Sequence, residues 1–241
     1  MPGLSDPARL LAAWEHAVSV PAAARGAVLV CHGGFAGDLE SVLGLSVGEV
    51  GVLAGRLYAE EFSETVEALL PCAGCGEVLD VRLPLAALSA VAPGRDCRVL
   101  TPDGGELTVR ALTTRDLLAA GRAAEPAAEL LSRCVSDAEG VPVDPAALMP
   151  EVAAEVDAAA ERLAGAAAAV VRTGCPDCGA EALVPVDIGA LLWERVASVA
   201  SALISEVAAL AAAFGWREAD VLGLSPVRRG MYLQLARGGA A

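Results

Sequence analysis

"LLPCAGCGEVLDVRLPLAAL", residues 69–88, and "TGCPDCGAEALVPVDIGALLWE", residues 173–194, repeat one short pattern. In each stretch two residues separate a pair of cysteines, and a glycine follows the second cysteine. The offset between the copies is constant (175 − 72 = 103), so that Cys72, Cys75 and Gly76 correspond to Cys175, Cys178 and Gly179. A pattern that recurs in register predicts two copies of one structural unit.

The likeness continues beyond the cysteines. Apolar residues match at the same offset in the run that follows each glycine: Val81 with Val184, Leu83 with Val186, Leu85 with Ile188 and Leu88 with Leu191. Apolar residues at every second position are typical of a strand with one buried face. We therefore predict a repeated unit that consists of a cysteine turn, a strand and the start of a helix.

The four cysteines predict a metal site. A Cys-x-x-Cys turn brings two thiolates to one side of a tight loop, and the glycine beside it permits a positive φ angle. Structural zinc takes four ligands, so one turn supplies half a site and two turns supply a complete one. The sequence thus predicts a structural Zn²⁺ ion in a split zinc ribbon, with four ligands: Cys72, Cys75, Cys175 and Cys178.

Other chemistry of paired cysteines stays open at this point. Disulfides suit an exported chain, but no export signal is present and the chain has seven cysteines, an odd number. A thioredoxin-like redox pair stands at a helix start, whereas both motifs here precede strand-like runs. An iron–sulfur cluster also takes four cysteines. The remaining cysteines, Cys31, Cys97 and Cys134, are expected to be small core residues.

The predicted fold class is α+β, mainly helical, with an inserted module of a β-hairpin and helices. Helices are expected over 5–20, with Ser5 as N-cap, over 21–30, and in two pieces over 46–70. We divide the chain into an N-terminal helical region (1–70), a first zinc knuckle and β-hairpin (71–112), a helical insertion (113–165), a second zinc knuckle and strand (166–190) and a C-terminal helical region (191–241).

The insertion opens with a hairpin signal. "CRVLTPDGGELTVRAL", residues 97–112, has two β-prone runs around a Pro-Asp-Gly-Gly turn. Helices should follow from Arg115, with Thr114 as N-cap, then over 126–135, and over 145–164 with Pro145 in the first turn. A strand near 168–172 should lead to the second knuckle.

The C-terminal region has the most regular pattern. Apolar residues recur at steps of three and four, which predicts a helix of about seven turns with one apolar stripe: Leu192, Val196, Val199, Leu203, Val207, Leu210 and Phe214. Such a stripe suits packing within the molecule or binding of a partner, and we favour the former.

After a turn at Gly215 and a short helix, a last helix should begin behind Ser225 and Pro226. On this last helix Arg228 and Arg229 are expected to face away from the apolar residues Val227, Met231 and Leu235.

Charge and hydropathy exclude several classes of partner. The net charge of −14 disfavours attraction to nucleic acid or to an anionic membrane. Glu206 interrupts the most apolar stretch, so we expect no membrane-spanning helix. The first residues lack a basic start and an apolar core, and we expect a cytoplasmic protein.

No catalytic constellation stands out in the sequence. The two histidines, His16 and His32, have no sequence-local partner and are expected to be surface or half-buried residues. A phosphate-binding P-loop and a Gly-x-Ser-x-Gly nucleophile elbow are both absent from the sequence. We therefore expect no enzyme.

The knuckles, the "LLWE" helix start and the ending "FGWREADVLGLSPVRRGMYLQL" together resemble the baseplate proteins of T-even-type phages. Relatives of that family occur in the gene clusters of contractile phage-tail-like injection systems. The resemblance covers most of the chain and is strongest over residues 69–88 and 173–236. It implies a non-enzymatic role in baseplate assembly, chaperone-like or accessory, with baseplate or tail subunits as partners.

In this interpretation the zinc ion locks the two knuckles and orients the helices that bind a partner. The candidate partner-binding residues are Trp193, Arg228, Arg229 and Tyr232. The alternative is a zinc-ribbon regulatory or nucleic-acid-associated protein. That alternative requires a basic stripe, whereas only Arg228 and Arg229 are adjacent and acidic residues outnumber arginines along the chain.

Overall fold

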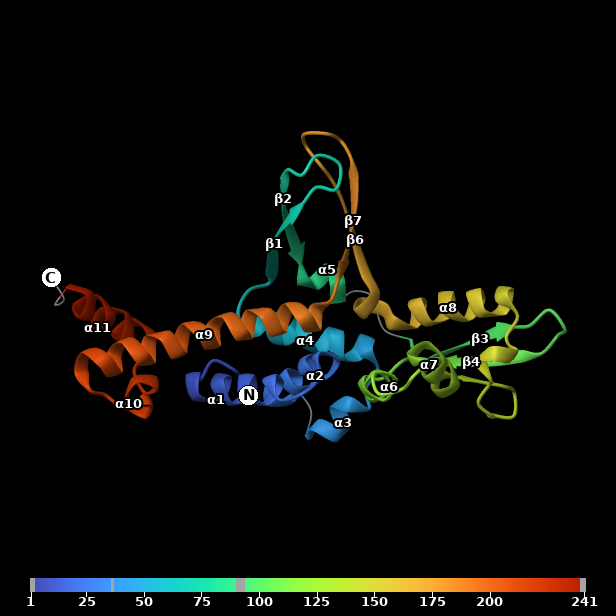
Figure 1. Ribbon diagram of the computed structural model, residues 1–241, viewed down its shortest axis with the longest axis horizontal. Coiled ribbons are helices and arrows are strands. Elements are labelled where there is room, and N and C mark those ends of the chain that lie inside the picture. Colours follow the sequence, from blue (N-terminus) through green and yellow to red (C-terminus); the bar gives the residue numbers. More distant parts are fainter. Residues whose placement is uncertain (1–2, 36, 90–93, 239–241) are drawn as a thin grey trace.

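The computed structural model describes residues 3–35, 37–89 and 94–238. Helices and strands mix in a mainly helical fold, as the sequence predicts. Figure 1 shows a helical body with two β-hairpins rising side by side from it. An inserted module lies at one end of the molecule, and the last two helices lie at the other.

Four N-terminal helices and the first half of a long C-terminal helix form the body. The N-terminal helices are α1 (Pro7–Val18), α2 (Ala22–His32), α3 (Leu39–Leu43) and α4 (Val47–Glu61). Asp6, not the predicted Ser5, caps α1, because its carboxylate accepts the backbone N–H of Arg9 at 2.9 Å. Ser46 and Glu49 form a capping box at the start of α4.

The repeated unit is present in both copies. Each knuckle is the loop of an antiparallel hairpin, and a helix follows its second strand: β1 (Thr65–Pro71), β2 (Val78–Pro84) and α5 (Leu85–Ser89), then β6 (Ala169–Gly174), β7 (Glu181–Val186) and α9 (Ile188–Phe214). Leu85 and Ile188 begin the two helices at the predicted offset. Val81 and Leu83 of β2 and Val186 of β7 are buried in the body's core.

The prediction that residues 46–70 are wholly helical is wrong beyond Glu61. Thr65–Pro71 is a strand because it pairs along its full length with β2, from Thr65 opposite Pro84 to Pro71 opposite Val78. Val66 is 3% exposed and contributes to the body's core. The N-terminal region (1–70) is therefore helical only up to α4, and its last residues belong to the first hairpin.

The inserted module has a separate small core. Its elements are β3 (Asp96–Leu100), β4 (Glu106–Arg110), α6 (Thr114–Ala120), α7 (Pro126–Cys134), β5 (Val135–Ser136), two 3-10 turns (Pro145–Ala147 and Gly165–Ala168) and α8 (Pro150–Ala164). Strands β3, β4 and β5 form one sheet, and Val99, Val109 and Val156 are buried between the sheet and α8. The hairpin prediction is confirmed.

Two details of the module differ from the prediction. The segment 145–164 is not one helix, because Pro150 begins α8 and the preceding Met149 has an extended backbone (ψ 148°). Thr113, not Thr114, caps α6, and its hydroxyl accepts the backbone N–H of Asp116 at 3.2 Å.

Helix α9 links the body to the C-terminal pair, α10 (Glu218–Leu222) and α11 (Pro226–Gly238). Most of its stripe packs inside the molecule, since Leu192, Val196 and Leu210 are fully buried and Leu203 is nearly so, but Phe214 at the end of the stripe is 40% exposed. By length and mean hydropathy (1.8) α9 could cross a membrane, and 22% of its most apolar window is buried inside the molecule. A single helix of this kind is weak evidence for a membrane span. Here its first half contacts α1, α2 and α4, and its end contacts α10 and α11.

Candidate metal centre

The two knuckles have the same backbone hydrogen bonds. In the first, the N–H of Cys72 donates to the carbonyl of Glu77 at 2.7 Å, and the N–H of Gly76 donates to the carbonyl of Cys72 at 2.8 Å. The equivalent bonds of the second knuckle both measure 2.9 Å. Gly76 and Gly179 have φ angles of +79° and +71°, which other residues rarely adopt. The glycines thus close both turns.

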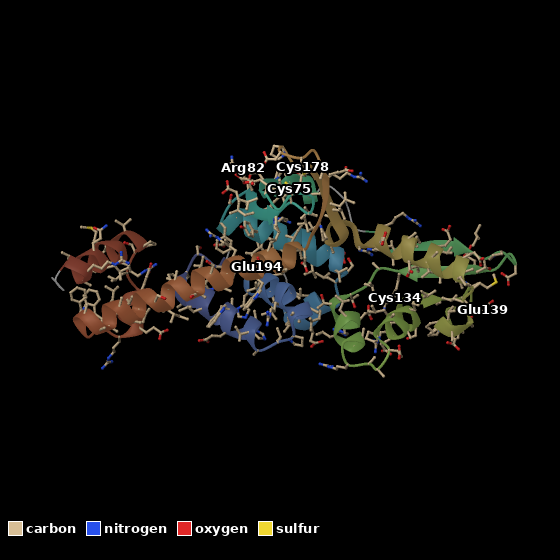
Figure 2. All side chains as sticks on the ribbon, turned by 45° about the horizontal axis from the view of Figure 1, so that its top comes forward. Cys75, Arg82, Cys134, Glu139, Cys178 and Glu194 are labelled. Carbon is tan, nitrogen blue, oxygen red and sulfur yellow. The ribbon has the colours of Figure 1, made fainter. Side chains whose placement is uncertain are left out.

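The structure brings the four predicted cysteines together. The sulfur atoms of Cys72 and Cys178 are 3.7 Å apart, as are those of Cys75 and Cys175, and all four lie within 4.8 Å of one another. In Figure 2, Cys75 and Cys178 lie beside each other at the tips of the hairpins β1–β2 and β6–β7. Among the described residues, no other group of three or more His, Cys, Asp or Glu ligands is found. This cluster could hold a metal ion.

The electrostatics of the cluster favour a bound cation. The backbone N–H groups of Cys75 and Gly74 lower the pKa of the Cys72 thiol to about 7. The N–H of Glu77 also lowers the pKa of Cys75, but the neighbouring thiols of Cys178 and Cys175 outweigh it and raise that pKa to about 12. Four thiolates this close repel one another, and a metal ion removes that repulsion when it replaces the protons.

Gly74 permits the knuckles to approach each other. A Cβ atom at this position would lie 3.1 Å from the Cβ of Ala180 and 3.3 Å from the sulfur of Cys178. The equivalent position of the second knuckle is Asp177, so the two copies are not interchangeable. Cys72 and Cys175 are buried, whereas Cys75 and Cys178 are exposed, so the site is open to solvent on one side only.

The four candidate partner-binding residues do not form one surface. Trp193 lies near the start of α9, about 30 Å along the helix from its end at 1.5 Å per residue. The guanidinium of Arg25 stacks over its ring, 4.6 Å from the centroid. Tyr232 lies at the other end, where its ring centroid is 4.8 Å from that of Trp216.

The expected orientation is confirmed for Arg229, which lies on the side of α11 opposite Val227, Met231 and Leu235. Arg229 is 6% exposed, and its Nε donates to Oε2 of Glu206 on α9 at 2.9 Å, while an Nη1 hydrogen donates to the carbonyl of Leu224 at 2.8 Å. The opposite face of α11, with Val227, Met231 and Leu235, is the exposed one. Arg228 is exposed, but it lies beside Leu235 at the rim of the apolar face, so the expectation that it faces away from that face is wrong.

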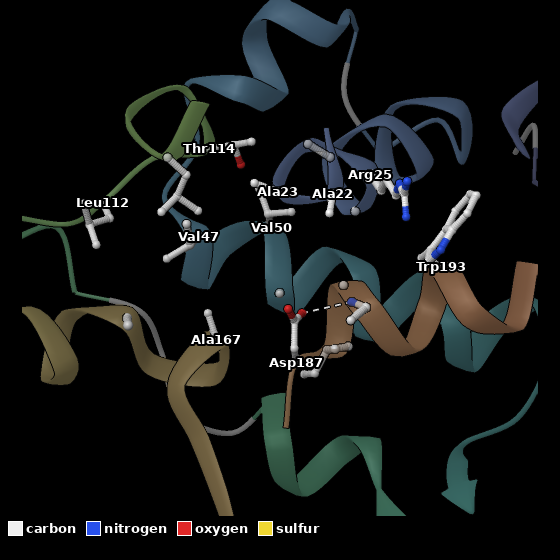
Figure 3. A pocket seen from close by; sticks show the side chains of 18 of the residues that line it. Ala22, Ala23, Arg25, Val47, Val50, Leu112, Thr114, Ala167, Asp187 and Trp193 are labelled. Atoms are coloured by element: carbon white, nitrogen blue, oxygen red, sulfur yellow. Dashed lines mark hydrogen bonds between the residues drawn. The ribbon is translucent and has the colours of Figure 1, made fainter. Parts of the chain in front are cut away.

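A histidine pair and a hollow have no counterpart in the sequence pattern. Nδ1 of His16 and Nε2 of His32 lie 3.0 Å apart, and burial together with His16 lowers the pKa of His32. Both side chains are half-buried, as predicted. A hollow of about 620 Å³ lies between α2, α4, α6 and the start of α9 (Figure 3). Small residues line much of it, and Asp187 caps α9 at its wall.

Three kinds of comparison with known proteins give no match to this chain: no family model, no curated protein and no solved structure. The likeness to phage baseplate proteins therefore rests on the sequence motifs alone.

Proposed function

We propose that the four-cysteine cluster binds one zinc ion and that this ion is structural. Four sulfur atoms arranged tetrahedrally at the zinc–sulfur distance of about 2.3 Å are about 3.8 Å apart. The separations of 3.7 Å in the two pairs agree with that value. Four protein thiolates also leave no coordination position for a substrate, which is the pattern of a structural site.

The distances favour a single ion over an iron–sulfur cluster. In a cluster, inorganic sulfide and more than one iron atom lie between the cysteines, so their sulfur atoms must be farther apart than around one ion. A single iron ion fits the same four thiolates, and elemental analysis of the purified protein distinguishes it from zinc. A disulfide is not favoured. In each close pair the two sulfur atoms come from different knuckles and are 3.7 Å apart, whereas the sulfur atoms of a disulfide are about 2.05 Å apart.

From the resemblance of the two knuckles and the C-terminal ending to phage baseplate proteins, we further propose a non-enzymatic assembly protein of a contractile phage tail or phage-tail-like injection system. It acts in the cytoplasm as a chaperone-like or accessory protein that binds baseplate or tail subunits. The structural observation that supports a partner-binding role is the direct connection of the second knuckle to α9. The strand β7 leaves the second knuckle and enters α9 through Asp187, so the cysteine cluster anchors the helix that carries α10 and α11 away from the body (Figure 1).

Nucleic acid is a poorer candidate partner. Arg228 and Arg229 are the only two arginines that are adjacent in the sequence. Arg229 is buried and paired with Glu206, so only Arg228 of this pair is exposed to a ligand. Binding of phosphates requires several accessible cations, and it gives a steep dependence on salt concentration.

The test is affinity purification of the tagged protein from cells that express its whole gene cluster. Recovery of baseplate or tail subunits is the expected result, and recovery of unrelated metabolic proteins alone would contradict the proposal. A gel-shift titration at two salt concentrations provides the second arm, in which salt-sensitive retention of DNA or RNA would favour the regulatory alternative.

A further inference from the structure

Helix α11 presents an apolar face that nothing in the described part of the chain covers. Val227, Met231 and Leu235 are 74%, 62% and 63% exposed. Their spacing of four residues places them on one side of the helix. Arg229, on the opposite side, holds α11 against α9 through Glu206. The helix is therefore fixed in place with its apolar face turned outward.

A small hollow adjoins this face. Its volume is about 330 Å³, and it is lined by Trp216, Asp220, Leu224, Arg228 and Tyr232. The ring centroid of Trp216 lies 5.0 Å from that of Phe214 and 4.8 Å from that of Tyr232. Packed aromatic rings beside an exposed apolar strip are the composition of a protein-binding hot spot, in which a partner's side chain enters a preformed recess.

Exposed positive charge gathers on α11, although the carboxylate of Asp220 on α10 lines the hollow beside it. Residues 221–241 contain three arginines, Arg228, Arg229 and Arg237, and no acidic residue, whereas the whole chain has a net charge of −14. Glu206 neutralises Arg229. Within the described residues no ion pair involves Arg228 or Arg237, and both are exposed. Viewed along the helix axis, Arg228 lies on one side of the apolar face and Arg237 on the other.

The apolar face and the two exposed arginines of α11 favour one kind of binding partner over others. A second copy that docked through the same face would bring unpaired arginines of both chains together, which is unfavourable. An anionic membrane would attract the arginines but repel the rest of this acidic chain. A partner helix with an apolar stripe and flanking carboxylates satisfies both the apolar face and the two arginines.

We propose that α11 binds an acidic amphipathic helix of a partner protein. The partner's apolar side chains cover Val227, Met231 and Leu235, one of them enters the hollow beside Trp216 and Tyr232, and its carboxylates pair with Arg228 and Arg237. This inference rests on the proposed function and deepens it, because it assigns the docking surface and the chemistry of the assembly partner.

The direct test uses two synthetic peptides and the full-length, metal-replete protein. Both peptides are 18-residue amphipathic helices with leucine on one face, flanked by glutamate in one peptide and by lysine in the other. Fluorescence anisotropy should show binding of the glutamate peptide, about tenfold weaker binding to Met231→Asp or to Arg228→Glu, and no binding of the lysine peptide. Leu100→Asp, an equally exposed leucine in the distant hairpin β3–β4, is the matched control and should bind as the parent protein does.

Four outcomes would overturn this inference. The first is equal binding of both peptides, and the second is no effect of Met231→Asp on binding of the glutamate peptide. The third is a dimer in sedimentation analysis that Met231→Asp dissociates, because a second copy is then the occupant. The fourth is binding to vesicles of phosphatidylglycerol that Met231→Asp abolishes. All variants should keep the parent's helical circular dichroism, since each changed side chain is exposed.

Purification from cells that express the gene cluster separates the two proposals. If the parent protein recovers tail subunits and Met231→Asp does not, both stand. If the parent protein and Met231→Asp recover tail subunits equally, the assignment of the docking surface to α11 is wrong and the assembly role remains. If the parent recovers none while the glutamate peptide still binds α11 as described, the assembly role is wrong and the chemistry of the surface remains.

Discussion

The sulfur atom of Cys72 lies 3.7 Å from that of Cys178, although 106 residues separate them along the chain. A metal ion shared by these residues would cross-link the hairpin β1–β2 to the hairpin β6–β7. Closing a loop of this length costs conformational entropy, and structural zinc in small peptides contributes roughly 10–16 kcal/mol of apparent binding free energy. We therefore expect metal binding to determine whether the two hairpins stay together.

Removal of the metal should destabilise the ribbon. We expect one metal ion per chain by elemental analysis, and a thermal midpoint lower by about 10 °C or more after chelation or in Cys175→Ser, since each kcal/mol lost shifts the midpoint by about 2–4 °C at this size. Circular dichroism melts measure the shift. Cys97→Ser, a half-buried cysteine of the inserted module, is the control and should retain the metal.

Two observations would refute the metal centre. One is purified protein without stoichiometric metal. The other is rapid alkylation of Cys72 and Cys175 in the metal-replete protein at neutral pH, because a ligand thiolate that is also buried should react slowly.

The stripe of α9 supports a prediction about packing. Leu192 is fully buried and belongs to the body's core, whereas Ile204, on the same helix, is 45% exposed. Leu192→Ala should reduce the free energy of unfolding by about 2–5 kcal/mol, because it leaves a cavity. Ile204→Ala should change it by less than about 1 kcal/mol. Denaturant titrations of both variants measure the difference, and equal effects would contradict the observed orientation of α9.

The sequence was most informative where chemistry restricts the choice of residue. Cysteine and glycine suit the tight knuckle turns, and their constant offset predicts the cluster of four cysteines, the second strand of each hairpin and the starts of α5 and α9. Thr65–Pro71 was assigned to a helix, because a strand's pairing partner lies elsewhere in the sequence and local pattern does not identify it.

Long-range contacts explain the remaining errors. The last helix was predicted correctly, but the choice of its buried face depends on Glu206, which lies 23 residues before Arg229 on another helix. The apolar residues of α11 would suggest the opposite orientation. The pairing of His16 with His32 likewise arises from the packing of α1 against α2, which no spacing along the chain encodes.

The ion pair between Arg229 and Glu206 should control the attachment of α11. Arg229→Ala leaves the Glu206 carboxylate and the Leu224 carbonyl without their donor, and loss of one partner of a largely buried pair costs about 3 kcal/mol. Amides of α11 should then exchange roughly 100-fold faster in hydrogen-exchange measurements. Arg228→Ala removes an exposed arginine from the same helix and should leave exchange unchanged. Equal protection in both variants would contradict this role of Arg229.

Asp116 supports a prediction about pH in the inserted module. It is 3% exposed and accepts two hydrogen bonds from the Arg110 guanidinium, at 2.7 and 2.9 Å. Burial alone would raise the pKa of Asp116, but the hydrogen bonds from Arg110 and Thr113 lower it to about 2. Because the folded pKa lies below the unfolded value of about 3.9, the stabilisation is complete above about pH 4 and is lost as the pH falls towards 2.

Asp116→Asn should therefore destabilise α6 by about 2–4 kcal/mol at pH 6. This difference in stability between the variant and the parent protein should become smaller as the pH falls from 4 to 2. Hydrogen exchange of the α6 amides reports on this module separately from the two knuckles, whose thiolates would lose a bound metal in acid. Asp157→Asn makes the same chemical change at an exposed position of α8 and should have little effect at either pH. A deficit that stays constant down to pH 2 would show that the charge of Asp116 is not what stabilises the contact with Arg110.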